Sequence, residues 1–425
     1  MMGRIRRGSL KVSHRMSEML SGDGVHITEI RGGTLTRDGW RTIGRSLLRA
    51  LTVALLWAFC GAPGLQAAER RLLAYYSSGS RRGNTPYSAA NIPFDRLTHI
   101  DHAFLRLSGK NDGSLDISPN LLEPELISRA HAAGVRVLIS LGGGGSGAAK
   151  PFAAVAADPV ARANMVKNVR DFVVQNGYDG VDLDWEYPEG LEERSHCTLL
   201  MAAIRKELPA PKYELSMAIP ADPNRPGSGS YDLEALAQIL DYFNVMTYDY
   251  HGPWSKHAGH NSPLFQNPAD PGHSRSSLAS AIDTYVNYFH ISPDKVNIGT
   301  GFYGYEFTTA ADLWGACDCA RTTFSRGYGP YIKQRIDKMG WKRYFDSEAQ
   351  APYLLRESRS EPGVITYDDP DSITRKVNYV LGTRGLGGFF TWVLGSDYDG
   401  QSQDLMTAMH AAFEKYKSAP VSPAK

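Results

Sequence analysis

The sequence has few cysteines, no long apolar run and no excess of charge of one sign. Four cysteines in 425 residues exclude a fold held by a dense disulfide framework. The most apolar stretch, Ala50–Cys60, is too short to cross a bilayer as a helix. Lys and Arg total 46 against 45 Asp and Glu, and beyond residue 50 there are 36 basic and 41 acidic residues. Binding to nucleic acid is therefore disfavoured.

The N-terminal region has the pattern of an export signal. A basic flank, the apolar run Ala50–Cys60 and small residues at Ala67 and Ala68 predict a secretory signal peptide cleaved near Ala67. We therefore assign residues 1–67 to an N-terminal extension and signal peptide. The mature chain is then expected to be secreted, extracellular or periplasmic, without membrane contact. An anchored N-terminal helix is the alternative, which Gly61 and Pro63 disfavour.

Three cysteines remain after that cleavage, namely Cys197, Cys317 and Cys319. Cys317 and Cys319 are separated by one residue, which predicts a strained bridge, so we expect any disulfide to include Cys197. A metal site at Cys317 and Cys319 would need further ligands at suitable spacing. No such His or Cys pair accompanies them, and ordinary thiols are the favoured interpretation.

Eight apolar stretches with the character of strands alternate with helical patterns. One example is the helical stripe Val166, Val169 and Val173, which Gly177 ends before the next strand. The eight expected strands are Leu72–Tyr76, Leu97–Leu105, Val135–Leu141, Tyr178–Glu186, Glu214–Ile219, Phe243–Tyr248, Val296–Tyr303 and Leu386–Trp392. This alternation predicts an α/β fold, a (β/α)8 TIM barrel spanning residues 68–420.

The interval between the seventh and eighth strands is too long for a single helix. Residues 305–366 are rich in aromatic side chains, so we expect a small α+β insertion subdomain there and not a disordered loop. Because it follows a strand, this subdomain would lie on the C-terminal face of the barrel, where barrel enzymes carry out their chemistry.

The densest chemical signal is the run DGVDLDWEYP, residues 179–188. Asp182, Asp184 and Glu186 alternate along a strand, so their side chains share one face at intervals of about 6.6 Å. In a barrel that face is the interior, where neighbouring carboxylates cannot all ionise and at least one pKa must rise. Glu186 is nearest the end of the strand and is our candidate proton donor.

Two simpler interpretations of this acidic row compete with catalysis. The carboxylates could pair with Lys or Arg elsewhere in the barrel, or they could hold a hard cation such as calcium or magnesium. Even spacing and the position at a strand end favour catalysis. The twelve histidines show no HxxxH pairing, and we predict neither a metal nor a cofactor.

The acidic run resembles the DxxDxDxE signature of family 18 glycoside hydrolases, the chitinases and their relatives, with Asp179, Asp182, Asp184 and Glu186 at its four acidic positions. Residues 140–143 (SLGG) resemble the family's SxGG motif, and residues 246–249 (MTYD) resemble its MxYD motif. The segment 305–366 is similar to the insertion domain of one chitinase subgroup.

The resemblance implies roles for particular residues. Glu186 would be the general acid and base, Asp184 would orient the substrate's acetamido group, and Asp182 would exchange a proton with Asp184. Residues implied to bind substrate are Tyr248, Asp249, Met246, Trp392, Trp254, Tyr303, Tyr75 and Phe104. Tyr305 departs from the subgroup, which commonly has arginine at that position.

The activity implied by the resemblance is a retaining, substrate-assisted hydrolysis of β-1,4-linked N-acetylglucosamine in chitin or chitooligosaccharides. We expect a monomeric enzyme whose partner is chitin or an oligosaccharide that contains N-acetylglucosamine. An endo-β-N-acetylglucosaminidase or a peptidoglycan-type N-acetylglucosaminidase is the alternative among hydrolases, because those substrates share the reacting group. A chitin-binding lectin on the same barrel is the alternative of another class. Such lectins typically lose the acid, whereas Glu186 is present.

Overall fold

The computed structural model describes residues 69–421, apart from 83, 146–147, 225–226, 228, 273–274, 322, 359 and 420. The expected signal peptide, with its cleavage point near Ala67, lies outside the described residues. Residues 67–425 form one compact unit. In the described part of that unit, no helix is both long and apolar enough to cross a membrane.

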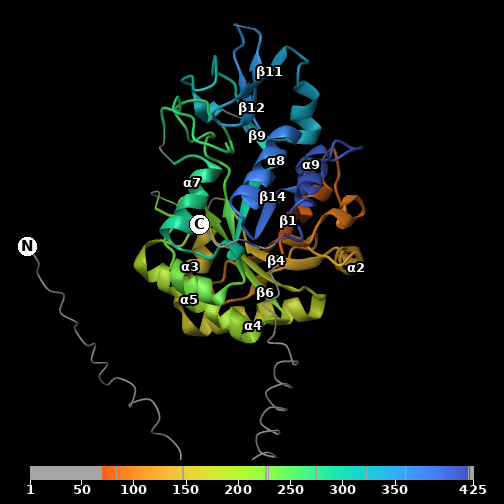
Figure 1. Ribbon diagram of the computed structural model, residues 1–425. Helices are drawn as coiled ribbons and strands as arrows, with labels where there is room; N and C mark the ends of the chain where they lie inside the picture. Colours follow the sequence, from red (N-terminus) through yellow and green to blue (C-terminus); the bar gives the residue numbers. More distant parts are fainter. Residues whose placement is uncertain are drawn as a thin grey trace, which may run out of the picture. The chain divides into compact units, whose positions relative to one another are not determined.

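Parallel strands of the described chain close into a barrel, as the alternating pattern predicts (Figure 1). The eight strands, in order around the barrel, are β1 (Arg71–Ser77), β2 (His99–Leu107), β4 (Arg136–Gly142), β5 (Gly180–Asp184), β6 (Glu214–Pro220), β7 (Tyr242–Met246), β8 (Val296–Gly301) and β14 (Gly388–Trp392). Pairing of β14 with β1 closes the circle. A short strand, β3 (Leu115–Asp116), pairs antiparallel with β2.

Helices follow the strands and cover the outside of the barrel. They are α2 (Pro124–Ala132), α3 (Ala149–Ala157), α4 (Pro159–Asn176), α5 (Gly190–Glu207), α6 (Leu233–Ile239), α7 (Leu278–Ile282), α8 (Pro370–Val377) and α9 (Asp404–Phe413). One turn of π-helix extends α7 over Asp283–Tyr288 and another extends α8 over Asn378–Thr383.

Helix α4 illustrates how the local sequence sets these boundaries. The Asp158 carboxylate accepts hydrogen bonds from the amides of Val160 and Ala161, and Pro159 occupies the first turn. Gly177 ends the helix in the left-handed conformation, as expected. The apolar core lies between the helices and the outward faces of the strands: Val181 and Leu183 of β5 point into it, while the alternate residues of β5 point into the barrel.

A second, antiparallel sheet lies between β8 and β14 in the sequence. Its order is β10 (Thr323–Gly327), β9 (Tyr303–Phe307), β13 (Val364–Thr366), β12 (Ala351–Arg356) and β11 (Trp341–Asp346). In Figure 1 β11 and β12 lie at the end of the molecule away from α4. The sheet occupies the region expected to hold the insertion subdomain; the subdomain limits 305–366 and the domain limits 68–420 stay predictions.

The cysteine expectation is wrong. Cys317 and Cys319 form a disulfide, and Cys197 is a free thiol buried in α5. The Cα atoms of the bonded pair are 5.0 Å apart, within the range that a disulfide spans.

A buried ion pair holds α8 against the barrel. Lys376 Nζ donates to Asp368 Oδ2 at 2.5 Å and to Ser262 Oγ at 2.9 Å, and both charged side chains are almost fully buried. Ser262 in turn donates to the backbone carbonyl of Thr247. The ion pair therefore also fixes the segment that follows β7.

We predict that Lys376→Met lowers the free energy of unfolding by about 3–5 kcal/mol, because it leaves the buried Asp368 carboxylate without its cation. Chemical denaturation measures this change. The matched control is Arg375→Met on the same helix, which removes an exposed pair with Asp371 and should cost less than about 1 kcal/mol. Equal effects of the two substitutions would contradict the assignment.

Candidate active site

A cavity of about 570 Å³ opens at the carboxyl ends of the barrel strands. Of the eleven residues proposed from the sequence, eight line it: Phe104, Asp184, Glu186, Met246, Tyr248, Asp249, Tyr303 and Trp392. They come from β2, β5, β7, β9 and β14 or from the residues directly after these strands. Four of these strands belong to the parallel barrel and end at the same rim, and β9 follows directly after the barrel strand β8. Residues far apart in the sequence therefore meet in one place.

The three carboxyls of the acidic row sit at increasing height in the barrel. Asp182 is fully buried, Asp184 is 5% exposed and belongs to the cavity wall, and Glu186 follows the end of β5 in a half-buried position. No ion pair found among the described residues involves any of the three, so pairing with Lys or Arg does not explain them. Asp184 and Glu186 line the cavity, whereas Asp182 is not part of its lining.

Asp182 is surrounded by hydrogen-bond donors. Its Oδ2 accepts from Ser140 Oγ at 2.8 Å and from Tyr75 at 2.9 Å. Its Oδ1 accepts from Ser216 Oγ at 2.7 Å and from Asn244 Nδ2 at 3.4 Å. Burial raises the pKa of Asp182, while these donors oppose the rise by stabilising the charged form. Asp182 is thus the member of the row whose surroundings best accommodate a negative charge.

A fourth carboxyl, which the sequence did not single out, lies beside this network. Asp101 on β2 is fully buried, and its Oδ2 accepts from Asn244 Nδ2 at 3.0 Å. Burial raises the pKa of Asp101 well above its usual value, and the nearby Asp182 raises it further. Asn244 therefore bridges two buried carboxyls, and its own side-chain oxygen accepts from Asn297.

Asp184 has the opposite surroundings, with few donors, and Glu186 lies beside it. Burial raises the pKa of Asp184 well above its usual value, and the carboxyls of Glu186 and Asp182 add to the rise. Asp184 Oδ1 makes no hydrogen bond to the described part of the protein. Burial also raises the pKa of Glu186, against hydrogen bonds from Tyr187 and Asp184. The raised pKa values therefore favour keeping a proton between the two carboxyls of this pair.

Glycines of the segment 140–145 let the chain approach this pair closely. A Cβ on Gly142, which has φ +112°, would lie 2.2 Å from the carbonyl oxygen of Asp184. A Cβ on Gly144 would lie 2.8 Å from Glu186 Oε1. Without side chains here, the Gly143 amide donates to the Asp184 carbonyl at 2.9 Å and the Gly144 amide reaches the Glu186 carboxyl.

Asp249 projects into the cavity from the opposite side. It adopts a left-handed backbone conformation with φ +62°, which Asp and Asn tolerate better than most residues. Tyr303 donates to its Oδ1 at 2.5 Å and Tyr305 donates to the same atom at 2.8 Å. Tyr305, the departure from the subgroup pattern, therefore has a definite role here as a second hydroxyl that fixes Asp249.

The aromatic residues proposed from the sequence divide into two groups. Trp392 lines the cavity floor and stacks on Phe104 with ring centroids 5.3 Å apart. Tyr75 does not line the cavity: it is 2% exposed beneath Trp392 and serves as a donor to Asp182. Trp254 is 54% exposed, lies against Tyr305 and is also outside the cavity lining. The expected contacts of Tyr75 and Trp254 with substrate therefore stay predictions.

Comparison with known proteins identifies the family of this chain. The model of the family "Glycosyl hydrolases family 18" matches residues 71–397. This chain belongs to glycosyl hydrolase family 18. It is 29% identical to "Probable chitinase 2" of Drosophila melanogaster over 405 residues, which cover 88% of this chain and 82% of that protein. With such relatives, it is a hydrolytic enzyme of the chitinase type.

Solved structures with the same fold include two chitinases. An immunomodulatory active chitinase from Trichuris suis is 26% identical with a TM-score of 0.71, covering 81% of this chain and 100% of that one. A class V chitinase from Nicotiana tobaccum, solved in complex with NAG4, is 24% identical with a TM-score of 0.70, covering 81% and 99%. The second likeness concerns the fold alone.

The electrostatics of this family 18 site predict a shift in its pH profile. Asp249 raises the pKa of Glu186, so Asp249→Asn should lower that pKa. Activity that needs protonated Glu186 is then lost at lower pH, and the alkaline limb of kcat/KM should move toward acid. The profile is measured on a soluble oligosaccharide. The control is Asp222→Asn, which removes another carboxyl that lines the cavity and should leave the alkaline limb in place. An alkaline limb that does not move in Asp249→Asn would contradict the coupling between Asp249 and Glu186.

Proposed function

We propose that this enzyme cleaves β-1,4-linked N-acetylglucosamine in chitin or chitooligosaccharides with retention of anomeric configuration. The observation that carries the proposal is the pair Asp184 and Glu186 at one strand end, with raised pKa values at the wall of the cavity. The curated relative from Drosophila is named a chitinase, and a solved protein of the same fold was crystallised with NAG4; both support this substrate class.

In the first step Glu186 donates its proton to the glycosidic oxygen, and the bond from that oxygen to C1 breaks. Asp184 projects from the same strand face as Glu186, so it is poorly placed to attack C1 from the far side of the sugar. The substrate's own acetamido oxygen attacks C1 instead and forms an oxazolinium ion. Asp184 accepts a hydrogen bond from the acetamido N–H and offsets the positive charge.

In the second step the Glu186 carboxylate takes a proton from water as the water oxygen attacks C1 from the side that the leaving group vacated. The oxazolinium ring opens, and the product keeps the β configuration. Asp182 carries a negative charge in addition to the one on the Asp184–Glu186 pair, because its four donors stabilise it as a carboxylate. A proton on Asp184 can pass toward either neighbour as the reaction proceeds.

Tyr248 and Trp392 position the reacting sugar in this proposal. Burial raises the pKa of Tyr248 well above its usual value, and the carboxyls of Asp184 and Asp249 raise it further. Its hydroxyl therefore stays protonated and can donate to the acetamido carbonyl. Trp392 offers an indole face at the cavity floor for the C–H groups of a pyranose ring, and Asp249 and Met246 border the same subsite.

We also propose that the enzyme is exported and acts as a monomer. The basic and apolar pattern that ends near Ala67 supports export. Amino-terminal sequencing of protein recovered from the medium or periplasm of the producing cells tests it: a mature terminus near Ala68 is expected. Retention of the whole leader on membranes would favour the anchored helix instead.

The decisive substitution is Glu186→Gln. We predict that wild-type enzyme releases initial β-anomer product from chitin oligosaccharides, and that Glu186→Gln lowers kcat by about 10²–10⁴ while substrate still binds. Proton NMR of fresh product and calorimetry measure the two quantities. Glu189→Gln makes the same change at an exposed glutamate outside the cavity and should be as active as wild type.

The same assay separates the alternatives. Initial α-anomer, or full activity in Glu186→Gln, would contradict the mechanism. A high-mannose glycopeptide and peptidoglycan fragments are offered in parallel: faster cleavage of either one than of chitin oligosaccharides would overturn the substrate assignment. Binding without any turnover in wild type would indicate the lectin alternative.

A further inference from the structure

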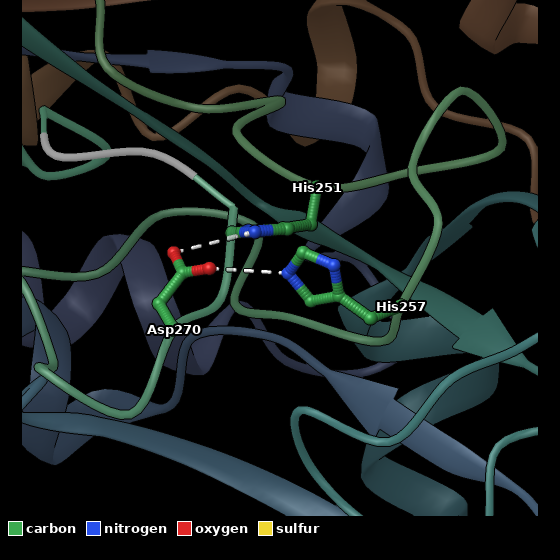
Figure 2. Close-up of side chains that lie close together, drawn as sticks. All are labelled: His251, His257 and Asp270. Carbon is green, nitrogen blue, oxygen red and sulfur yellow. Dashed lines mark hydrogen bonds and ion pairs between the residues drawn. The ribbon is translucent and has the colours of Figure 1, made fainter.

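A second cluster of reactive side chains lies in the long connection between β7 and α7. His251, His257 and Asp270 come together there (Figure 2), with spacings of five and twelve residues between them. Each contributes one donor atom, and the three atoms lie within 4.8 Å of one another. The HxxxH pattern does not detect this group, because its three residues are spread along a folded loop and do not share a helix.

The distances between the donor atoms suit a small metal ion. His251 Nε2 lies 3.4 Å from Asp270 Oδ2, and His257 Nε2 lies 3.1 Å from Asp270 Oδ1. Ligands of a tetrahedral zinc ion, each about 2.0–2.1 Å from the metal, are about 3.3 Å apart. Figure 2 shows the Asp270 carboxylate directed at both imidazole rings. The side chains of His251 and Asp270 are 2% and 1% exposed and that of His257 is 12% exposed.

The tautomer of His251 is set by its other ring nitrogen. Nδ1 lies 3.0 Å from the backbone carbonyl oxygen of His260, a group that can only accept, so Nδ1 carries the hydrogen. In the neutral ring the lone pair is then on Nε2. That atom is buried, makes no hydrogen bond and faces the Asp270 carboxylate. An imidazole held by a carbonyl at one nitrogen, with a lone pair at the other, is the usual arrangement of a metal ligand.

The surrounding chain is fitted closely to the cluster. A Cβ on Gly259 would lie 2.4 Å from the His251 ring, and a Cβ on Gly272 would lie 2.8 Å from His257 Cε1. His257 forms a β-bridge with Ala316, next to the disulfide between Cys317 and Cys319. The Gly272 amide also donates to Asp270 Oδ1 at 2.8 Å and helps to orient the carboxylate.

We propose that His251, His257 and Asp270 bind one divalent transition-metal ion, of which Zn²⁺ is the best match. Two imidazoles with one carboxylate suit zinc and its neighbours in the first transition row. Calcium and magnesium prefer sites made of oxygen ligands. Three protein ligands leave the fourth position to a water molecule.

The position of this site indicates a structural role. The connection begins with Tyr248 and Asp249 and ends with Arg275 and Ser276, all of which line the catalytic cavity. A metal ion bound by both His251 and Asp270 would link the beginning of the β7–α7 connection to its end. The ion would stabilise the cavity wall without taking part in the chemistry of the acidic row. This inference is independent of the proposed substrate.

Metal binding by tag-free protein, dialysed first against a chelator, tests the proposal. We expect one Zn²⁺ per chain by elemental analysis after removal of excess metal, and one Co²⁺ with the visible absorption of a tetrahedral site. Saturating Zn²⁺ should raise Tm by about 2–5 °C. His257→Ala and Asp270→Asn should each weaken Zn²⁺ binding at least about 100-fold, and Mg²⁺ should not raise Tm.

The matched control is His131→Ala. His131 Nε2 pairs with Asp179 Oδ2 at 2.8 Å on the surface, outside the three-ligand cluster, and this variant should bind Zn²⁺ like wild type. Circular dichroism establishes that His257→Ala and Asp270→Asn are folded, and an unfolded variant is replaced by His257→Gln. Equal Zn²⁺ binding by the folded variants and wild type, or no Zn²⁺ bound by wild type, would overturn the proposal. In the second case the cluster is a hydrogen-bonded His–Asp–His bridge only.

Discussion

The constraint on which the site depends is that carboxyl groups inside the barrel cannot all carry charge. Asp101, Asp182, Asp184 and Glu186 all have raised pKa values, and burial is the largest cause for each. The hydrogen bonds differ: Asp182 accepts four, whereas Asp184 has an oxygen without a partner. This asymmetry concentrates negative charge deep in the barrel and leaves the proton near the cavity, where a leaving group can take it.

The rest of the structure positions the acidic row and the residues that face it across the cavity. Close approach at Gly142 and Gly144 brings backbone amides to Asp184 and Glu186. On the opposite wall, Asn261 accepts from the Asp249 amide at 2.9 Å, while the neighbouring Ser262 is fixed by the buried Lys376. The proposed metal would fasten the same β7–α7 connection at a third point. Rigidity on both walls keeps reacting groups at the short distances that catalysis requires.

Periodicity and motifs predicted the barrel, its eight strands and eight of the seventeen residues that line the cavity. Local spacing could place Asp182, Asp184 and Glu186 on one face because a strand alternates. It could not place Asp101, because its contact with Asn244 joins strands on different sides of the barrel. The same limit applies to Tyr75, whose contact with Asp182 as a buried donor also joins strands that are not neighbours. The disulfide and the His251 cluster depend on loop conformation, which has no regular period.

Infrared spectroscopy of the carboxyl carbonyl stretch at neutral pH tests the central claim most directly. Protonated carboxyls absorb at a different frequency from carboxylates. The spectrum of wild type minus that of Asp184→Asn therefore reports whether the acidic row keeps a proton. We predict a protonated-carboxyl band in wild type that is lost or displaced in Asp184→Asn, and no change in Asp171→Asn, whose exposed carboxyl has a lowered pKa. Identical spectra for wild type and Asp184→Asn would contradict a proton held between Asp184 and Glu186.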